Sequence, residues 1–318
     1  MKFTNFSSNI VTEVVLLGFS NLHQLQKPLF FLFLVIYILT LIGNALVILM
    51  IQIDHRLHTP MYYFLKNLSW MEIIITTTVT PKMLTLLISN KNTISFFACI
   101  LQSYIYFIAG SAEVLLLAAM SIDRYMAICN PLRYTAIMST QVCQVMVLSC
   151  WLGSFFAITA SMLLQVSLPV CGSNVIDHFF CDSGPMLEMI CADTHFLQAL
   201  DFAVSCFTLL SSVSATTVSY IYIIITVMKM PSAKGRRKTF GTCTSHITVA
   251  SLYYGSSIFI YIKPAGSSSM EFNKVATVFN TVVTPLLNPI IYNFRNKTVK
   301  EVLRDTLARV LATLKSKV

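Results

Sequence analysis

Two acidic side chains fall inside stretches of this sequence that are otherwise apolar. Glu72 lies in the run 59–80, and Glu113 lies in the run 97–128. A carboxylate among apolar residues is costly to ionise, so such groups pair with one another, take up a proton or hold a cation. Glu72 and Glu113 could share a proton or a small cation such as sodium, or form a protonated, hydrogen-bonded packing pair. Further oxygens for a cation would come from Asn44, Ser69 and Asn288.

An Asp-Arg pair stands near the end of the second run. The stretch Met120–Tyr134 carries Asp123, Arg124 and Tyr125, and Pro131 closes the predicted helix. An arginine at the end of a membrane helix reaches the interface, and a neighbouring aspartate can hold it by charge pairing. Two interpretations stay open for this stretch: a marker of the helix end, or a functional switch.

The nine cysteines fall into two groups by position. Cys99 and three cysteines of the loop 165–196 lie at one end of the predicted spans, and the other five lie in the spans or at the opposite end. The loop cysteines are Cys171, Cys181 and Cys191. Four cysteines allow three disulfide pairings, and all three stay open at this point.

The same loop offers residue types that bind metals, but the chain lacks the pattern of an enzyme. His178, Cys181 and Asp182 are potential ligands, although a disulfide would consume Cys181. Nowhere does the sequence suggest a nucleophile with its base, or histidines at metal-binding spacing. We therefore expect a disulfide framework rather than a metal site, and no enzymatic activity.

Long apolar helices must position these groups. Hydrophobic residues make up 56% of the chain and charged residues only 11%, with a mean hydropathy of +0.73. Such a composition predicts an all-α membrane protein, here a seven-transmembrane helix bundle over residues 28–294 between tails 1–27 and 295–318. The predicted spans are 28–51, 59–80, 97–128, 141–165, 197–228, 238–262 and 273–294.

The basic residues predict how the bundle is oriented. Sixteen of the 22 Lys and Arg residues lie on one side of the predicted spans. Because basic loops stay in the cytoplasm, we expect an extracellular N-terminus and a cytoplasmic C-terminus in the plasma membrane. Asn5 is then an external glycosylation acceptor, and the first span, with no signal peptide before it, acts as its own insertion signal. Basic residues sit at helix ends, so no nucleic-acid partner is expected.

Three polar positions within the spans have a structural interpretation. Asn44 beside Gly43 suggests close helix packing, and His246 suggests a hydrogen bond between helices rather than a proton relay. Pro289 frees a backbone carbonyl, which Asn288 and water could satisfy, and so predicts a kink. Beyond the last span, apolar residues at helical spacing predict a short amphipathic helix on the inner lipid leaflet; they are Val299, Leu303, Leu307, Leu311 and Leu314.

Taken together, these motifs resemble those of the rhodopsin-like G-protein-coupled receptors. Within that group the chain is similar, over essentially its whole length, to olfactory receptors of the tetrapod type (class II). Small departures are Ser121-Ile122 before the Asp-Arg pair, Thr239 and Gly241 after Lys238, and Glu72 where many members carry Asp. The matching stretches are Leu57–Leu65, Met120–Tyr134, Ser219-Tyr220, Lys238–His246 and Pro285–Tyr292.

The resemblance implies a ligand pocket between the third, fifth, sixth and seventh spans. Its members are aromatic, aliphatic or hydroxyl-bearing, which suits small, mostly neutral volatile molecules. Tyr106 replaces the aspartate of amine receptors and Val282 the lysine of visual pigments, while Asp201 and Lys263 leave room for polar ligands. The implied pocket residues are Tyr106, Phe107, Gly110, Ser111, Val204, Ser205, Thr208, Tyr254, Ser257, Ile258, Tyr261 and Thr281.

The resemblance also implies a switch and a partner. Arg124 would leave Asp123 for Tyr220 and the tail of a stimulatory heterotrimeric G protein, which raises cyclic AMP. It implies disulfides Cys99–Cys181 and Cys171–Cys191, no cofactor other than an allosteric sodium ion at Glu72 and Glu113, and contact with membrane lipid. The implied switch residues are Asp123, Arg124, Tyr125, Tyr220, Asn288, Pro289 and Tyr292.

Two other functions compete with that of an odorant receptor. A transporter or channel would carry internal repeats and charged residues along a continuous path, and neither is seen. A non-olfactory chemosensory receptor of the same class would share every motif above, so the tissue of expression decides between these two.

Overall fold

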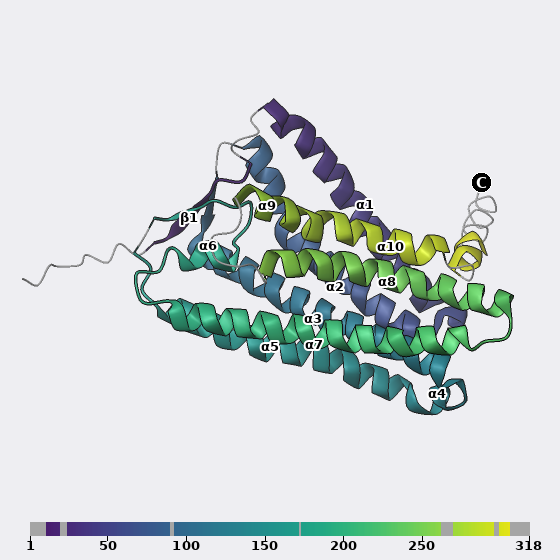
Figure 1. Cartoon of the computed structure of the whole chain (residues 1–318). Coiled ribbons are helices and arrows are strands. Elements are labelled where there is room, and N and C mark those ends of the chain that lie inside the picture. The colour runs from purple at the N-terminus through teal and green to yellow at the C-terminus, as the bar shows by residue number, and fades with distance from the viewer. Residues whose placement is uncertain are drawn as a thin grey trace, which may run out of the picture.

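A computed structural model describes residues 11–19, 24–89, 92–171, 173–261, 270–295 and 299–305. Its long helices run side by side as one bundle (Figure 1). They are α1 (Gln26–Ile53), α2 (Pro60–Ile88), α3 (Phe96–Cys129), α5 (Thr140–Ser167), α7 (His195–Met228), α8 (Ala233–Tyr261), and a last one built from α9 (Met270–Val278), the π-helical η3 (Phe279–Val283) and α10 (Thr284–Arg295). The fold is a seven-transmembrane bundle.

Six of these segments, among the described residues, are long and apolar enough to cross a membrane. The seventh, α8, has the length for a span, but it begins with the basic stretch 234–238 and contains many hydroxyl side chains. Large apolar side chains are exposed along the outer faces of the helices, for example Phe31 at 64% and Phe207 at 78%. Lipid covers such faces in a multi-pass membrane protein, which explains why the helices are apolar on both sides.

Short elements close the two ends of the bundle. One end carries β1 (Glu13–Leu16), β2 (Thr93–Ser95), β3 (Val175–Ile176) and α6 (Ser183–Leu187), and is called the sheet end below. The other end carries the turn η2 (His55–Leu57) and α4 (Pro131–Ile137), and is called the α4 end. Figure 1 shows β1 and α6 at one extremity of the bundle and α4 at the other.

The small sheet joins three segments that are far apart in the sequence. Its strand order is β2-β1-β3, with β1 antiparallel to β2 and parallel to β3. Val14 and Leu16 of β1 are fully buried, so the segment before the first span is part of the packed structure. The predicted tail 1–27 therefore contains a strand, which was not expected from the sequence.

Two disulfides fasten the loop between α5 and α7 to this end. Cys99 at the start of α3 is bonded to Cys181, with 5.4 Å between the Cα atoms. Cys171 is bonded to Cys191, with 5.7 Å between the Cα atoms. This is the pairing that the resemblance implies, and it holds the loop residues Phe179 and Phe180 fully buried beneath the sheet.

The contact between α1 and α10 explains two polar positions in the spans. The Nδ2 atom of Asn44 donates to the carbonyl oxygen of Pro285, at 3.1 Å. This carbonyl lies four residues before Pro289, so it is the one that Pro289 leaves without a helical partner. We expected Asn288 and water in this role; instead Asn44 reaches across from the neighbouring helix. A Cβ atom on Gly43 would lie 3.1 Å from Cγ of Pro289, which explains the glycine.

Residues 299–305 are helical, as predicted for the start of the amphipathic segment, and Val299 and Val302 are buried. Leu303 is 37% exposed. Leu307, Leu311 and Leu314 lie outside the described residues, as does the glycosylation candidate Asn5.

Candidate functional site

The Asp-Arg pair lies in the last two turns of α3, at the α4 end. Arg124 Nη2 lies 2.8 Å from the Oδ2 atom of Asp123, and its Nε atom also donates to that oxygen, at 3.2 Å. The hydroxyl of Tyr134, on α4, donates to Oδ1 of Asp123 at 2.8 Å. Asp123 is completely buried, so its charge depends on these two partners. The sequence analysis did not assign a role to Tyr134.

Beside this pair, Tyr220 on α7 is bonded to His246 on α8. Its hydroxyl lies 2.7 Å from Nδ1 of His246, whose Nε2 lies 3.2 Å from the carbonyl oxygen of Leu117 on α3. A carbonyl only accepts, so Nε2 carries the proton and Nδ1 accepts from the tyrosine. His246 thus joins α3, α7 and α8, in agreement with the predicted contact between helices. Tyr220 is engaged here rather than with Arg124.

The other switch candidates surround these groups. Tyr125 packs edge-on against Tyr222, with 5.8 Å between ring centroids. Pro289 packs against Gly43, and Tyr292 is buried with a hydroxyl that has no hydrogen-bond partner among the described residues. A buried hydroxyl without a partner is unusual in a folded protein, and the switch role of these residues stays a prediction.

The two buried glutamates lie on α2 and α3, midway along the bundle. Glu72 is 1% exposed and Glu113 is fully buried. The Nδ2 atom of Asn288, on α10, donates to Oε1 of Glu72. Both carboxyl oxygens of Glu113 and the Oδ1 atom of Asn288 have no hydrogen-bond partner in the part of the chain that the structure describes. These oxygens fit a proton or a small cation, and the predicted contribution of Asn288 agrees with its position beside Glu72.

An inner cavity of ≈ 70 Å³ lies between α3, α7, α8 and η3. Its wall is mostly apolar, with a few hydroxyl groups, and Tyr253 reaches across it to donate to the carbonyl of Gly110 at 3.2 Å. Eight of the residues implied by the resemblance line it: Tyr106, Phe107, Gly110, Ser111, Val204, Ser205, Thr208 and Ser257. The analysis missed Val114, Ile158, Leu209, Tyr253 and Asn280.

Three implied pocket residues do not line the inner cavity, so their role in ligand binding stays a prediction. The hydroxyl of Tyr254 is hydrogen-bonded to Thr216 at 3.1 Å, whereas its neighbour Tyr253 lines the cavity. Thr281 donates to the carbonyl of Thr277 within its own helix, and Ile258 is 38% exposed on the outside of α8.

Helical geometry explains why these three side chains do not line the inner cavity. One residue turns a helix by about 100°, so a shift of one position moves a side chain off the cavity. Asn280 takes the place expected for Thr281, within the π-helical η3 that follows α9. The side chain of Tyr261 lies outside the described residues.

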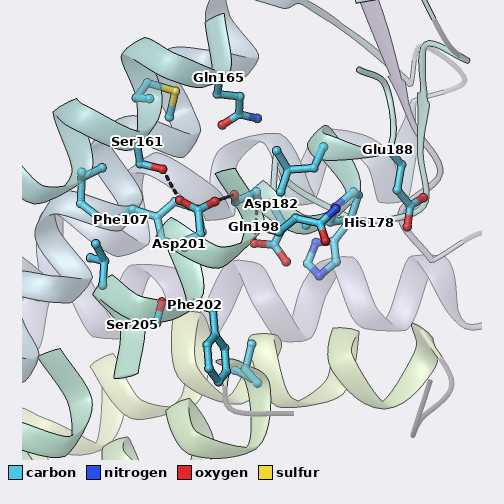
Figure 2. A pocket seen from close by; sticks show the side chains of 18 of the residues that line it. Phe107, Ser161, Gln165, His178, Asp182, Glu188, Gln198, Asp201, Phe202 and Ser205 are labelled. Carbon is cyan, nitrogen blue, oxygen red and sulfur yellow. Dashed lines mark hydrogen bonds between the residues drawn. The ribbon is translucent and has the colours of Figure 1, made fainter. Parts of the chain in front are cut away.

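An outer cavity of ≈ 380 Å³ lies at the sheet end, between α5, α6, α7 and the loop before α6. It shares Phe107, Ile158, Val204 and Ser205 with the inner cavity, so the two cavities are adjacent. Figure 2 shows that polar side chains gather in its wall, among them Asp182, Asp201 and His178. The outer cavity therefore differs from the inner one in its chemistry.

Burial sets the protonation of two loop residues in this wall. His178 is 1% exposed, and burial, helped by the charge of Lys274, lowers the pKa of its imidazole to about 3. Burial raises the pKa of the Asp182 carboxyl to about 6. At neutral pH the histidine is therefore uncharged and Asp182 is mostly ionised. Among the described residues no group of three or more His, Cys, Asp or Glu side chains could hold a metal ion, and Cys181 is in a disulfide.

A further polar contact at the α4 end links η2 to residues 299–305. Arg56 donates to both carboxyl oxygens of Asp54, with Nη2 to Oδ2 at 2.8 Å, and to Oδ2 of Asp305 at 3.1 Å. The hydrogen bonds from Arg56 hold the pKa of the Asp54 carboxyl well below its usual range. The sequence shows Arg56 as a basic residue in a short loop, but it does not reveal that Asp305, far along the chain, is its partner.

The chain was compared with known protein families and curated proteins. A family model described as olfactory receptor matches residues 33–310. Olfactory receptor 6S1 of Homo sapiens is 48% identical over 302 residues, which cover 95% of this chain and 91% of that protein. Olfactory receptor 6E1 of Mus musculus is 47% identical over 304 residues (95% and 97%), and olfactory receptor 6T1 of Homo sapiens is 47% identical over 310 residues (97% and 96%).

Proposed function

The chain belongs to the olfactory receptor family, and we propose that odorant binding in its two adjacent cavities is transmitted through Arg124 to a stimulatory G protein. As a member of this family it is an odorant receptor that acts through G proteins, and not an enzyme. The class of G protein, the residues of the site and the orientation in the membrane are the parts that we propose.

We assign the apolar body of the odorant to the inner cavity. The support is its composition: aromatic and aliphatic side chains with the hydroxyls of Ser111, Ser205 and Thr208, and no charged residue among those that line it. Apolar contact supplies most of the affinity in such a site, and one or two hydrogen bonds orient the ligand. The predominant ligands are therefore small, mostly neutral volatile molecules.

We propose that the conformation described here is the inactive one. Arg124 is held by Asp123, and Tyr220 is held by His246, so neither is available to a partner protein. An odorant that binds more tightly to a state in which α8 has moved away from α3 shifts the population toward that state. In that state Arg124 exchanges Asp123 for Tyr220 and the G protein, and Tyr292 finds a partner for its hydroxyl.

The sheet end faces outward in this proposal. Its disulfides suit the oxidising exterior, and the α4 end together with the stretch 229–238 carries most of the basic residues near the spans. The N-terminus is then extracellular, with Asn5 as its glycosylation site, and the C-terminus is cytoplasmic in the plasma membrane. Residues 299–305 rest against the inner lipid leaflet.

We propose that Glu72 and Glu113 hold a sodium ion or a shared proton in the inactive state. The partnerless oxygens of Glu113 and Asn288 support this assignment. A cation there would stabilise the closed arrangement of α2, α3 and α10, so the ion would lower basal signalling. The test measures basal activity at different sodium concentrations. If it does not change with sodium in wild type, and does not change in Glu113→Gln either, the sodium assignment is wrong and the shared proton is the one that remains.

The single observation that carries the proposal is that one helix, α3, carries both the Asp123–Arg124 pair, with its carboxylate fully buried, and residues that line the two cavities. A panel of neutral odorants applied to cells that express the chain should raise cyclic AMP in a concentration-dependent way. The response should disappear when the stimulatory G protein is deleted. A response that persists without it would assign the receptor to a different G protein.

A further inference from the structure

The outer cavity carries negative charge that a receptor for neutral volatiles does not use. The carboxylates of Asp182, Asp201 and Glu188 all line it. Of the described residues in its wall, none is Lys or Arg. Asp201 lies on α7, Asp182 immediately precedes α6, and Glu188 immediately follows α6, so three segments bring these acids together.

Asp201 is held in a fixed position with acceptor capacity to spare. It accepts hydrogen bonds from the hydroxyls of Ser161, on α5, and of Ser183, on α6, the latter at 3.2 Å. Figure 2 shows both bonds converging on this carboxylate at the edge of the cavity. A carboxylate has about four lone-pair sites, so two donors leave room for a third from a ligand.

His178 provides the second, independent observation. It lines the cavity and is 1% exposed, and its Nδ1 atom accepts from the backbone N–H of Phe180 at 3.4 Å. A neutral imidazole with an accepting Nδ1 carries its proton on Nε2. That Nε2 atom has no hydrogen-bond partner among the described residues. A buried donor without an acceptor is destabilising, and His178 belongs to the wall of this cavity, so a ligand oxygen that reached Nε2 would satisfy it.

The adjacency of the two cavities sets the shape of a ligand that would reach both. Phe107, Val204 and Ser205 belong to both walls. An elongated molecule can place its hydrocarbon body between α3 and α8 and its polar head beside Asp201. None of the described acidic residues of α3 lines either cavity, so any cationic head must be held from α7 and the loop instead.

We propose that the outer cavity is a second ligand subsite, which binds a protonated amine that carries a neighbouring oxygen. The ammonium group donates to Asp201 in the field of Asp182 and Glu188, and the oxygen accepts from Nε2 of His178. Ligands with a carboxylate head are repelled by the same wall. This inference rests on the proposed function, because it adds a head-group site to the cavity that takes the odorant body.

The experiment compares four probes with the same hydrocarbon chain: 2-aminooctan-1-ol, octylamine, octan-1-ol and octanoate. Each is tested on the full-length receptor by cyclic AMP in cells and by thermal shift of the purified protein. Wild type should rank them in the order given, with about tenfold between the amines and octan-1-ol, the size expected for a charge-assisted hydrogen bond. Octanoate equal to or better than octylamine would overturn the proposal.

Two variants separate the halves of the head group. Asp201→Asn should remove the preference for amines and leave the response to octan-1-ol within about twofold. His178→Phe should bring 2-aminooctan-1-ol down to the level of octylamine. The matched control is Asp193→Asn, which makes the same change of charge at an exposed position near the start of α7. An unchanged amine preference in Asp201→Asn would contradict the proposal, and so would an equal loss in Asp193→Asn.

Surface expression is measured for every variant. If Asp201→Asn fails to fold, Glu188→Gln replaces it, because Glu188 is exposed and its substitution makes the same cavity less negative. It should reduce the amine preference about two- to threefold, and no reduction would overturn the inference.

The signalling proposal and the subsite proposal fail in different ways. Amine-selective thermal shifts without any cyclic AMP would sink the signalling proposal alone, whereas cyclic AMP responses to neutral probes with no effect of Asp201→Asn would sink the subsite alone.

Discussion

Tyr134 on α4 donates its hydroxyl to Oδ1 of Asp123 on α3, at 2.8 Å, so the aspartate that holds Arg124 is itself held from a separate helix. The same contact, together with burial, raises the pKa of the Tyr134 hydroxyl well above its usual range, so it stays protonated and remains a donor. The loop between α3 and α5 is thereby coupled to the Asp123–Arg124 pair.

Tyr134→Phe should raise basal signalling. The change removes one hydrogen bond to a buried, charged carboxylate, about 1.5–3 kcal/mol, and so shifts the two-state population roughly 10- to 150-fold toward the active state. The measurement is basal cyclic AMP normalised to surface expression. Tyr222→Phe is the matched control, because Tyr222 is 54% exposed and loses only a peripheral hydroxyl. Basal activity equal to that of wild type would mean that Tyr134 does not restrain the pair.

Tyr253→Phe should change odorant potency, while Tyr254→Phe should leave it nearly unaltered. Only Tyr253 lines the inner cavity, and its hydroxyl spans to the carbonyl of Gly110. Loss of a polar contact in a ligand pocket is worth about 1–3 kcal/mol, or roughly 5- to 150-fold in potency. Dose–response curves for one active odorant test this pair. A larger loss of potency in Tyr254→Phe than in Tyr253→Phe would instead support Tyr254 as the pocket residue, as the resemblance implies.

Asn44→Ala should lower the thermal stability of the receptor. The substitution leaves the Pro285 carbonyl without its partner and removes a bond to the carbonyl of Thr40, at a cost of about 1–2 kcal/mol. The melting temperature of the purified protein is the measurement. Asn67→Ala serves as control, since the Nδ2 atom of Asn67 donates only to Tyr63, four residues earlier in the same helix. Equal losses in the two variants would argue against a special role for Asn44.

His178 should make the receptor less stable in acid. The pKa of its imidazole is about 3 in the folded protein, below the ordinary 6.5. Between these two pH values the unfolded chain therefore binds a proton that the folded chain does not bind. The stability that the neutral ring contributes is therefore complete above about pH 6.5 and is lost as the pH falls toward 3, on the order of 5 kcal/mol over the whole range. His178→Phe should flatten the decline of the melting temperature between pH 6.5 and 4.5.

Asp182 acts on stability in the opposite sense over part of that range. Its pKa is about 6 in the folded protein against an ordinary 3.8, so the folded state binds the extra proton and gains stability as the pH falls through 6. Asp182→Asn is accordingly the comparison variant, and it should steepen the acid decline that His178→Phe flattens. Two variants with the same pH profile as wild type would contradict both assignments.

Much of the fold followed from the sequence because the signals are long and local. Apolar runs predicted the helices, and Pro131 predicted the end of α3, which the structure places at Cys129. The strand Glu13–Leu16 was missed since its partners lie about 80 and 160 residues away in the chain, and no periodicity in one short segment reveals them.

The sequence predicted which helices line the candidate site, but predicted less well which residue of each helix faces the cavity. Gly110 and Ser111 line the inner cavity as implied, because α3 is regular there. Tyr253 and Asn280 line the cavity where Tyr254 and Thr281 were expected, because a shift of one helical position decides which side chain faces it. The bonds from Tyr134 to Asp123 and from Asn44 to Pro285 join different helices, and only the packed bundle brings these groups together.

The central claim is that odorant binding reaches the G protein through Arg124. The most direct measurement is odorant-driven cyclic AMP in cells that express wild type or Arg124→Ala at matched surface levels. Arg304→Ala serves as control, because that side chain is 81% exposed and carries the same charge near the α4 end. The account predicts that Arg124→Ala abolishes the response while odorant still shifts the melting temperature, and that Arg304→Ala keeps the response. A full odorant response in Arg124→Ala would contradict the account.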